Sequence, residues 1–136
     1  MANKLKRNYI QLVNNVKEVQ EKDAEPKFET FLTPHFIPTS LWYETIDVME
    51  EVEEMENKAN KDLQAGKPVS QTKLMRDQMQ QLQDVVLKIY GNQFTKEQLM
   101  DGLHAPNMIE ELGEQVAFIA RGQQNEASKK FVESKS

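Results

Sequence analysis

The chain has 136 residues, of which 38% are hydrophobic and 29% charged, and its formal net charge is −5. This length fits one small domain, and the absence of cysteine excludes disulfides, thiolate nucleophiles and cysteine–metal sites. The negative charge argues against a nucleic-acid partner, and no apolar run approaches the about 20 residues that span a bilayer. We therefore expect a soluble, non-exported intracellular domain that binds neither nucleic acid nor membrane.

Two segments near the N-terminus are rich in strand-forming residues. Residues 9–13 and 28–33 are separated by a polar, charged stretch over residues 14–27. This pattern predicts an antiparallel hairpin over about residues 5–34 with a long polar loop. Two strands alone are marginally stable, so the hairpin must pack on helices or pair with another copy.

A long helix is predicted after a proline elbow. Pro34 and Pro38 bracket residues 35–37, which predicts extended chain because proline disfavours helix at the preceding residue. Thr39 or Ser40 is the expected N-cap, and a Gly-Pro stop follows at residues 66–68. The apolar stripe of this helix recurs at steps of three and four: Leu41, Thr45, Val48, Val52, Met55, Ala59 and Leu63.

The two halves of this helix are expected to differ. Trp42, Ile46 and Met49 broaden the stripe in the front half, which predicts deep packing there. The back half presents a narrow seam, which either covers the next helix or pairs with another subunit.

Three further helices are expected before residue 122. The first begins at the N-cap Ser70, carries Met75 and Met79 in its apolar stripe, and has glutamines on its solvent-facing side. Thr95 with Gln98 predicts a capping box for a short second helix. A third, last helix runs from about residue 106 to a glycine stop at residue 122. The solvent-facing glutamines of the first of these helices are Gln78, Gln80, Gln81 and Gln83.

The fold class expected is mainly α (α+β), with a small N-terminal β-hairpin packed on about four helices. A single domain is predicted over residues 1–122, with the hairpin at about 5–34 and the helices at about 39–121. Residues 123–136 have almost no apolar content, which predicts a flexible C-terminal tail.

Charge is distributed unevenly along the chain. An acidic face is expected on the long helix, from Glu44, Asp47, Glu50, Glu51, Glu53, Glu54 and Glu56. A basic arm precedes it, from Lys4, Lys6, Arg7, Lys17 and Lys22. The two are expected to attract each other within the chain or between copies, although exposed pairs contribute little individually.

No set of residues predicts catalysis. His35 and His104 lie in turns without a second metal ligand at helical spacing, and the glycines are spaced as helix stops rather than as a phosphate loop. The acidic run lacks the loop and glycine of a calcium site. We therefore expect no enzyme activity, no catalytic residue, no cofactor and no metal.

Four short segments carry a resemblance to a known family. They are residues 31–38 (FLTPHFIP), 43–47 (YETID), 92–95 (NQFT) and 101–106 (DGLHAP). Over roughly residues 5–122 the chain resembles the tail assembly chaperones of long, non-contractile-tailed (siphovirus-type) bacteriophages and related prophages. Proteins of this kind bind the tape measure protein, keep its hydrophobic segments soluble and help to recruit tail tube subunits.

The resemblance also implies a place and a mode of expression. Such a protein acts in the cytoplasm of the infected or lysogenic bacterial host and is absent from the mature virion. Many are made in two forms by programmed frameshifting, and Lys129-Lys130 is compatible with a slippery codon run.

Two alternative functions stay open. One is a structural virion protein, such as a tail-completion or connector component. The other is a small DNA-binding regulator, which the net charge and missing basic helix disfavour.

The methionine-bearing helices and the proline elbow are the expected interaction surface. Methionine side chains either fill the core or form an adaptable groove for an apolar client helix. The residues expected in that groove, or in a subunit contact, are Phe36, Trp42, Met55, Leu63, Met75 and Met79. Self-association is also expected, because the hairpin edge and the helix seam are both suited to pairing with another copy.

Overall fold

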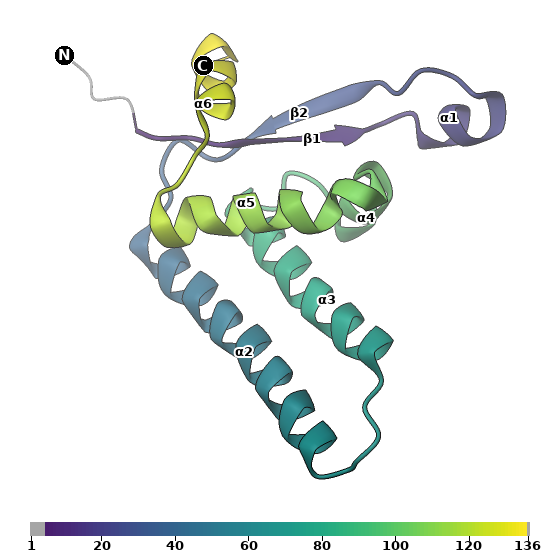
Figure 1. Ribbon diagram of the computed structural model, residues 1–136. Helices are drawn as coiled ribbons and strands as arrows, with labels where there is room; N and C mark the ends of the chain where they lie inside the picture. Colours follow the sequence, from purple (N-terminus) through teal and green to yellow (C-terminus); the bar gives the residue numbers. More distant parts are fainter. Residues whose placement is uncertain (1–4, 136) are drawn as a thin grey trace.

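The computed structural model describes residues 5–135 and is mainly helical, with a two-stranded antiparallel hairpin near the N-terminus, as the sequence predicts (Figure 1). Its elements in chain order are β1 (Tyr9–Val13), α1 (Val16–Lys22), β2 (Phe28–Leu32), α2 (Thr39–Gln64), α3 (Gln71–Ile89), α4 (Lys96–Gly102), the 3₁₀ turn η1 (Ala105–Asn107), α5 (Met108–Arg121) and α6 (Glu126–Lys135).

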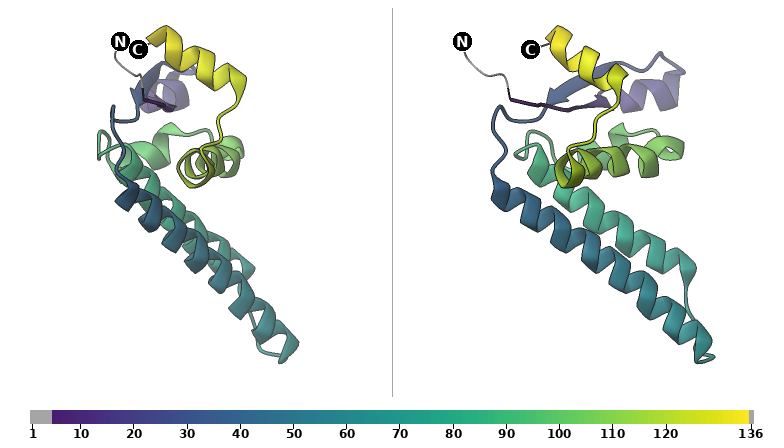
Figure 2. Two further views of the ribbon diagram at one scale, coloured as in Figure 1. Left: turned by 90° about the vertical axis from the view of Figure 1, so that its left-hand side faces the viewer. Right: turned by 60° about the vertical axis from the view of Figure 1, so that its left-hand side comes forward.

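The elements form layers. Helix α5 lies between the hairpin and the base of the α2–α3 pair, while α6 lies on the opposite side of the hairpin (Figures 1 and 2). Helices α2 and α3 run antiparallel and project away from the other layers, so we call residues 39–89 the arm. The hairpin, α4, α5 and the base of the arm make up the body.

The hairpin has the predicted strands but a different connection. Tyr9 pairs with Leu32 and Val13 with Phe28. The expected long loop contains the helix α1, and the Asn15 side chain holds its two ends together. The Asn15 amide nitrogen donates to the Glu25 carbonyl at 3.0 Å, and its oxygen accepts from the Lys27 amide at 2.8 Å.

The core forms where the sheet, the C-terminal half of α3, α4 and α5 meet. Its buried residues are Ile10, Leu12, Leu41, Val86, Ile89, Tyr90, Phe94, Leu99 and Leu112. Gly102 allows α4 to approach β1, because a Cβ at this position would lie 2.9 Å from Leu12 Cβ and 3.1 Å from the Val13 carbonyl oxygen. Close backbone approach of this kind requires glycine.

Several helix ends confirm the predictions from sequence. Ser70 Oγ accepts from the Lys73 amide at 3.2 Å, and Thr95 and Gln98 form both halves of a capping box. Gly122 ends α5 in the left-handed conformation with φ 64°. The predicted N-cap of α2 is wrong: the first helical bond runs from the Leu41 amide to the Pro38 carbonyl, so the helix already includes Thr39.

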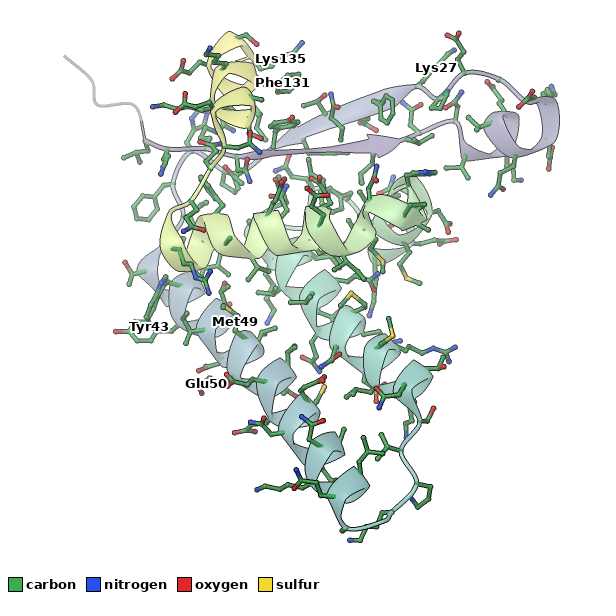
Figure 3. The ribbon with its side chains drawn as sticks, in the orientation of Figure 1. Lys27, Tyr43, Met49, Glu50, Phe131 and Lys135 are labelled. Carbon is green, nitrogen blue, oxygen red and sulfur yellow. The ribbon has the colours of Figure 1, made fainter. Side chains whose placement is uncertain are left out.

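The C-terminal segment differs from the expected flexible tail, because residues 126–135 form α6. Phe131 lies on this helix (Figure 3). Its ring centroid is 4.2 Å from that of Tyr9, and Val132 is buried. The Gln124 amide also donates to the Arg7 carbonyl at 2.8 Å. Two adjacent apolar residues therefore hold this polar helix against the hairpin; the domain limit at residue 122 stays a prediction.

The basic residues of the N-terminal segment do not contact the acidic face of α2 in the described part of the chain. The Lys6 ammonium donates to the Gly122 carbonyl at the end of α5, where a cation is favourable. Arg7 Nε donates to the Thr33 carbonyl at 2.8 Å. The salt bridge among residues 5–135 joins Lys96 to Asp84 at 2.9 Å. Lys4 lies outside the described residues.

Candidate partner-binding site

The distal half of the arm carries little core. Between residues 52 and 79 Ala59 alone is buried, and the seam residues Val52, Met55 and Met79 are half-buried. Two helices can cover only the stripe that each turns toward the other. The apolar residues at the end of α2 and the start of α3 therefore remain in contact with water.

The predicted interaction residues fall into two separate surfaces. Leu63 is 49% exposed and Met75 53% exposed, and we call this pair the arm-tip surface. Phe36, Trp42 and the neighbouring Tyr43 form the elbow surface, at the other end of α2. Since Leu63 lies 21 positions after Trp42, the two surfaces lie about 32 Å apart along the helix axis.

The remaining two predicted residues are more enclosed. Met55 is half-buried in the seam, and Met79 packs against the core cluster. Met75, which the sequence places in the same stripe as Met79, is instead exposed, whereas the neighbouring Leu74 is half-buried. The six predicted residues therefore do not form one groove.

The elbow surface has a structural part and a free part. The Trp42 indole N–H donates to the Ala120 carbonyl at 3.0 Å, which joins the start of α2 to one of the unpaired carbonyls at the end of α5. The Trp42 and Tyr43 rings meet edge to face, with centroids 5.1 Å apart. Tyr43 is 62% exposed and points away from the body (Figure 3), and Phe36 is 68% exposed.

A buried polar network, which periodicity did not reveal, fixes the body. Gln115 Oε1 accepts from the Tyr90 hydroxyl at 2.5 Å and from the Asn8 amide at 3.1 Å. Gln115 Nε2 donates to the Tyr9 carbonyl at 2.7 Å and to Glu111 at 3.1 Å. All four positions of one amide are satisfied, so Gln115 ties α5 to both β1 and α3.

Burial in this network changes proton affinities. It raises the pKa of Tyr90 well above the usual 10.0, and the nearby Glu111 carboxylate adds to the rise. Burial also raises the pKa of Glu111 above the usual 4.5, although its hydrogen bond to Gln115 opposes the change. The only sequence signal for Gln115 was its place between Leu112 and Phe118 on the buried face.

A second buried glutamine corrects the sequence interpretation of α3. The sequence pattern places Gln83 on the solvent-facing side of this helix. In the structure Gln83 is 6% exposed, and its amide lies 3.8 Å from Met108 Sδ. The start of α5 covers this side of α3, which the pattern of α3 alone does not show. Gln78 lies at the edge of the α2–α3 seam, where its amide donates to the Val52 carbonyl at 3.3 Å and to Glu56 at 3.0 Å.

A groove on the other side of the body is a second possible binding surface. It has a volume of about 980 Å³ and lies between β1, α1, the α4–η1 connection and α5. Val16 and Phe28 form apolar parts of its wall, Met100 is 55% exposed, and Asp101 and Glu114 contribute acidic groups. The sequence patterns did not predict this groove, because its wall combines four separate elements.

Chemistry-bearing groups are sparse in the described part of the chain. Within residues 5–135, no group of three or more His, Asp or Glu side chains is placed to hold a metal ion. In the same residues, no helix is long and apolar enough to cross a membrane. The notable features of the surface are therefore apolar side chains exposed to solvent and the acidic side of α2.

Comparison with known protein families gives a match. A family model described as "Phage tail chaperone protein" matches residues 4–136, which is nearly the whole chain. No curated protein and no solved structure matches the chain.

Proposed function

The chain belongs to the phage tail chaperone family, and we propose that it binds the tape measure protein, keeps its apolar segments soluble and helps to recruit tail tube subunits. One observation carries the proposal of an apolar client. Of nine large apolar side chains exposed in the described residues, five lie on the arm or its elbow. They are Phe36, Trp42, Tyr43, Leu63 and Met75.

The arm suits an amphipathic helix as its client. A third helix laid along α2 and α3 would cover the half-buried seam and reach Leu63 and Met75. Methionine adapts to different client side chains at little cost. The acidic side of α2 stays in water, which keeps a loaded chaperone soluble and favours client helices with basic flanks. Many weakly bound copies along one long client would gain avidity.

The family points to a non-enzymatic role. We place the protein in the host cytoplasm during tail assembly and outside the finished virion. The rival assignment, a structural component of the tail, differs on this point. Mass spectrometry of purified virions separates the two: peptides of this chain in stoichiometric amount would contradict a chaperone that leaves before completion.

Substitutions at exposed residues test the client surface. The double variant Leu63→Glu/Met75→Glu should lose capture of co-expressed tape measure protein, because a charge at each position prevents apolar contact. Both side chains are about half exposed, so the fold should be retained. Met79 is left unchanged because it packs against the core.

Met100→Glu is the matched control, since Met100 is equally exposed but lies in the groove on the other side of the body. Capture by Met100→Glu should equal that of the unchanged chain. If Met100→Glu loses the client while the arm-tip double variant keeps it, the client binds in the groove and the arm proposal is wrong. Circular dichroism and the thermal transition verify folding of each variant.

A further inference from the structure

The two outer edges of the β-hairpin differ in how far neighbouring elements cover them. The outer edge of β1 is covered at both of its ends by neighbouring elements. Gln124 donates to the Arg7 carbonyl at 2.8 Å, and Gln115 to the Tyr9 carbonyl at 2.7 Å. Gly102 of α4 packs directly against the backbone of Val13. Natural sheets protect their edges in this way because an open edge pairs with other chains.

The outer edge of β2 is covered at one end alone, at Leu32. The Thr33 amide bonds to the Asn8 carbonyl and the Asn14 amide to the Lys27 carbonyl, both at 2.9 Å, which fixes the direction of the whole ladder. Every second residue from position 27 to 33 therefore bonds to β1, and the backbone groups of Phe28, Thr30 and Leu32 point outward.

One of these outward groups has a partner in the described chain: the Leu32 carbonyl accepts from the Gln93 amide at 2.7 Å. Within residues 5–135, the outward backbone groups of Phe28 and Thr30 have none. Beside them, the Phe28 side chain is 59% exposed. The open edge thus combines free donors and acceptors with an apolar side chain.

We propose that this edge pairs with the same edge of a second copy of the chain. The two β2 strands run antiparallel about a two-fold axis at Thr30, so that the two hairpins join into one four-stranded sheet. Thr30 faces Thr30 of the partner subunit, and Phe28 faces the partner's Leu32. This surface is separate from the arm-tip surface, and the inference does not depend on the proposed client.

The sequence around Thr30 is self-complementary, which favours a second copy over an unrelated strand. Pro26 and Pro34 lie four residues on either side of Thr30, so in this register each proline faces the other and marks the end of the pairing. Glu29 faces the partner's Phe31, and no like charges are directly opposed.

The neighbouring registers are worse. An axis at Glu29 would place two carboxylates directly opposite each other, which is unfavourable. An axis at Phe31 would place Phe28 opposite Pro34, which has no amide to donate. Two-fold pairing also closes on itself, so the edge is used up in a dimer rather than extended into a filament.

Disulfide trapping tests the register directly, because the chain has no cysteine of its own. In the proposed dimer the two Thr30 Cα atoms lie about 5.5 Å apart, within the range of about 4.4–6.8 Å for a disulfide. The two Phe28 Cα atoms are four residues out of step and more than about 13 Å apart. Under mild oxidation Thr30→Cys should therefore run mainly as a dimer on a non-reducing gel.

Phe28→Cys, at a more exposed position on the same strand, should stay monomeric under the same conditions. Equal trapping of both variants would show random collision, and trapping of Phe28→Cys alone would show a different register. Either result overturns the proposal.

Sedimentation velocity on the full chain gives an independent measure. Thr30→Pro removes an outward amide without touching the β1–β2 ladder, so it should abolish concentration-dependent dimerisation. Thr30→Val is its control: both variants lose the 3.1 Å bond from the Gln11 side-chain amide to Thr30 Oγ1, but only proline removes the backbone N–H of residue 30.

Glu29→Gln should tighten the dimer, since the two Glu29 carboxylates lie diagonally across the two-fold axis.

If Thr30→Pro does not fold by circular dichroism, Phe28→Lys takes its place, because it changes only an exposed side chain. An unchanged chain that stays monomeric up to millimolar concentration contradicts the proposal. So does a Thr30→Pro variant, or its Phe28→Lys replacement, that dimerises as well as Thr30→Val.

Discussion

In the body, the side chains of Ile89, Leu99 and Leu112 are at most 1% exposed, whereas at the arm tip Leu63 and Met75 remain about half exposed. Both regions carry apolar residues at helical spacing. The difference is the number of neighbours: α3 meets α4, α5 and the sheet at the base of the arm, but only α2 near its tip. The same pattern thus produces a core in one place and a surface in the other.

This contrast shows what a helical stripe can and cannot establish. A stripe indicates which face of a helix is apolar, and the packing of other elements decides whether that face is filled. Stability should therefore depend on the body, while changes at the arm tip should affect partners and leave the fold intact. Substitutions of the same kind in the two regions test this division.

Leu112→Ala should have the largest effect. Leu112 is 0% exposed and lies in the core cluster, so its truncation leaves a cavity; we expect a loss of about 2–5 kcal/mol in the free energy of unfolding. Leu63→Ala makes the same chemical change at the arm tip and should cost less than about 0.5 kcal/mol. Urea denaturation measures both. Equal losses would show that the arm tip is packed in solution.

Gln115→Leu should have the next largest effect. The substitution removes four hydrogen bonds and leaves the Tyr90 hydroxyl and the Asn8 amide buried without their partner. An unsatisfied buried group costs about 1–3 kcal/mol, and we expect a total loss of about 3 kcal/mol. Gln78→Leu is the counterpart in the arm, where partly exposed groups regain water, so a loss under about 1 kcal/mol is expected.

Thermal or urea unfolding followed by circular dichroism measures this pair. A Gln115→Leu variant as stable as the unchanged chain would mean that the network contributes nothing beyond an apolar contact. A Gln78→Leu loss equal to that of Gln115→Leu would remove the distinction between body and arm.

Much of the local structure was predictable, because it depends on neighbouring residues. Ser70, the Thr95–Gln98 box and Gly122 act within one helical turn, and the chain shows them directly. The strands were predictable for the same reason, since alternation is a local property. The family resemblance also rested on short continuous segments, and the family match confirms it.

What was missed depends on contacts between distant residues. Gln115 is buried because Asn8 and Tyr90, 107 and 25 residues away, supply its partners. Helix α6 is held by Phe131 against Tyr9, which a reading of residues 123–136 alone cannot detect. The six residues expected in a groove or a subunit contact are spread along the arm, because the length of α2 separates the elbow from the arm tip; their role in binding stays a prediction.

Glycine substitutions should give a smaller contrast. Gly102→Ala places a Cβ within 2.9 Å of Leu12 and 3.1 Å of the Val13 carbonyl oxygen, so α4 must move away from β1; a loss of about 1–3 kcal/mol is expected. Gly66→Ala at the arm tip meets no atom within 4 Å but has φ +76°, and its backbone strain should cost about 1 kcal/mol. A Gly102→Ala variant less affected than Gly66→Ala would contradict the close approach of α4 to β1.

The smallest expected effect concerns Glu111, and it depends on pH. The folded state raises the pKa of this carboxyl above its usual 4.5, chiefly through burial. Between 4.5 and the folded-state pKa the folded chain therefore holds more protons at this group than the unfolded chain does. The free energy of unfolding must then fall as the pH rises through this window. Charged Glu111 thus destabilises the fold at neutral pH, and protonation relieves the penalty.

Glu111→Gln should remove this penalty while keeping an oxygen that accepts from Gln115 Nε2. The variant should be slightly more stable than the unchanged chain at pH 7, and the difference should vanish below the usual carboxyl pKa of 4.5, where Glu111 is neutral in both states. Glu53→Gln on the exposed side of the arm removes one acidic charge without changing the network, so it separates net charge from burial. Urea titrations at pH 4 and pH 7 measure all three chains. A Glu111→Gln variant that is less stable at pH 7 would show that the charged carboxylate supports the Gln115 network. The contrast between a fully hydrogen-bonded body and a solvated arm would then include the half-buried Glu111.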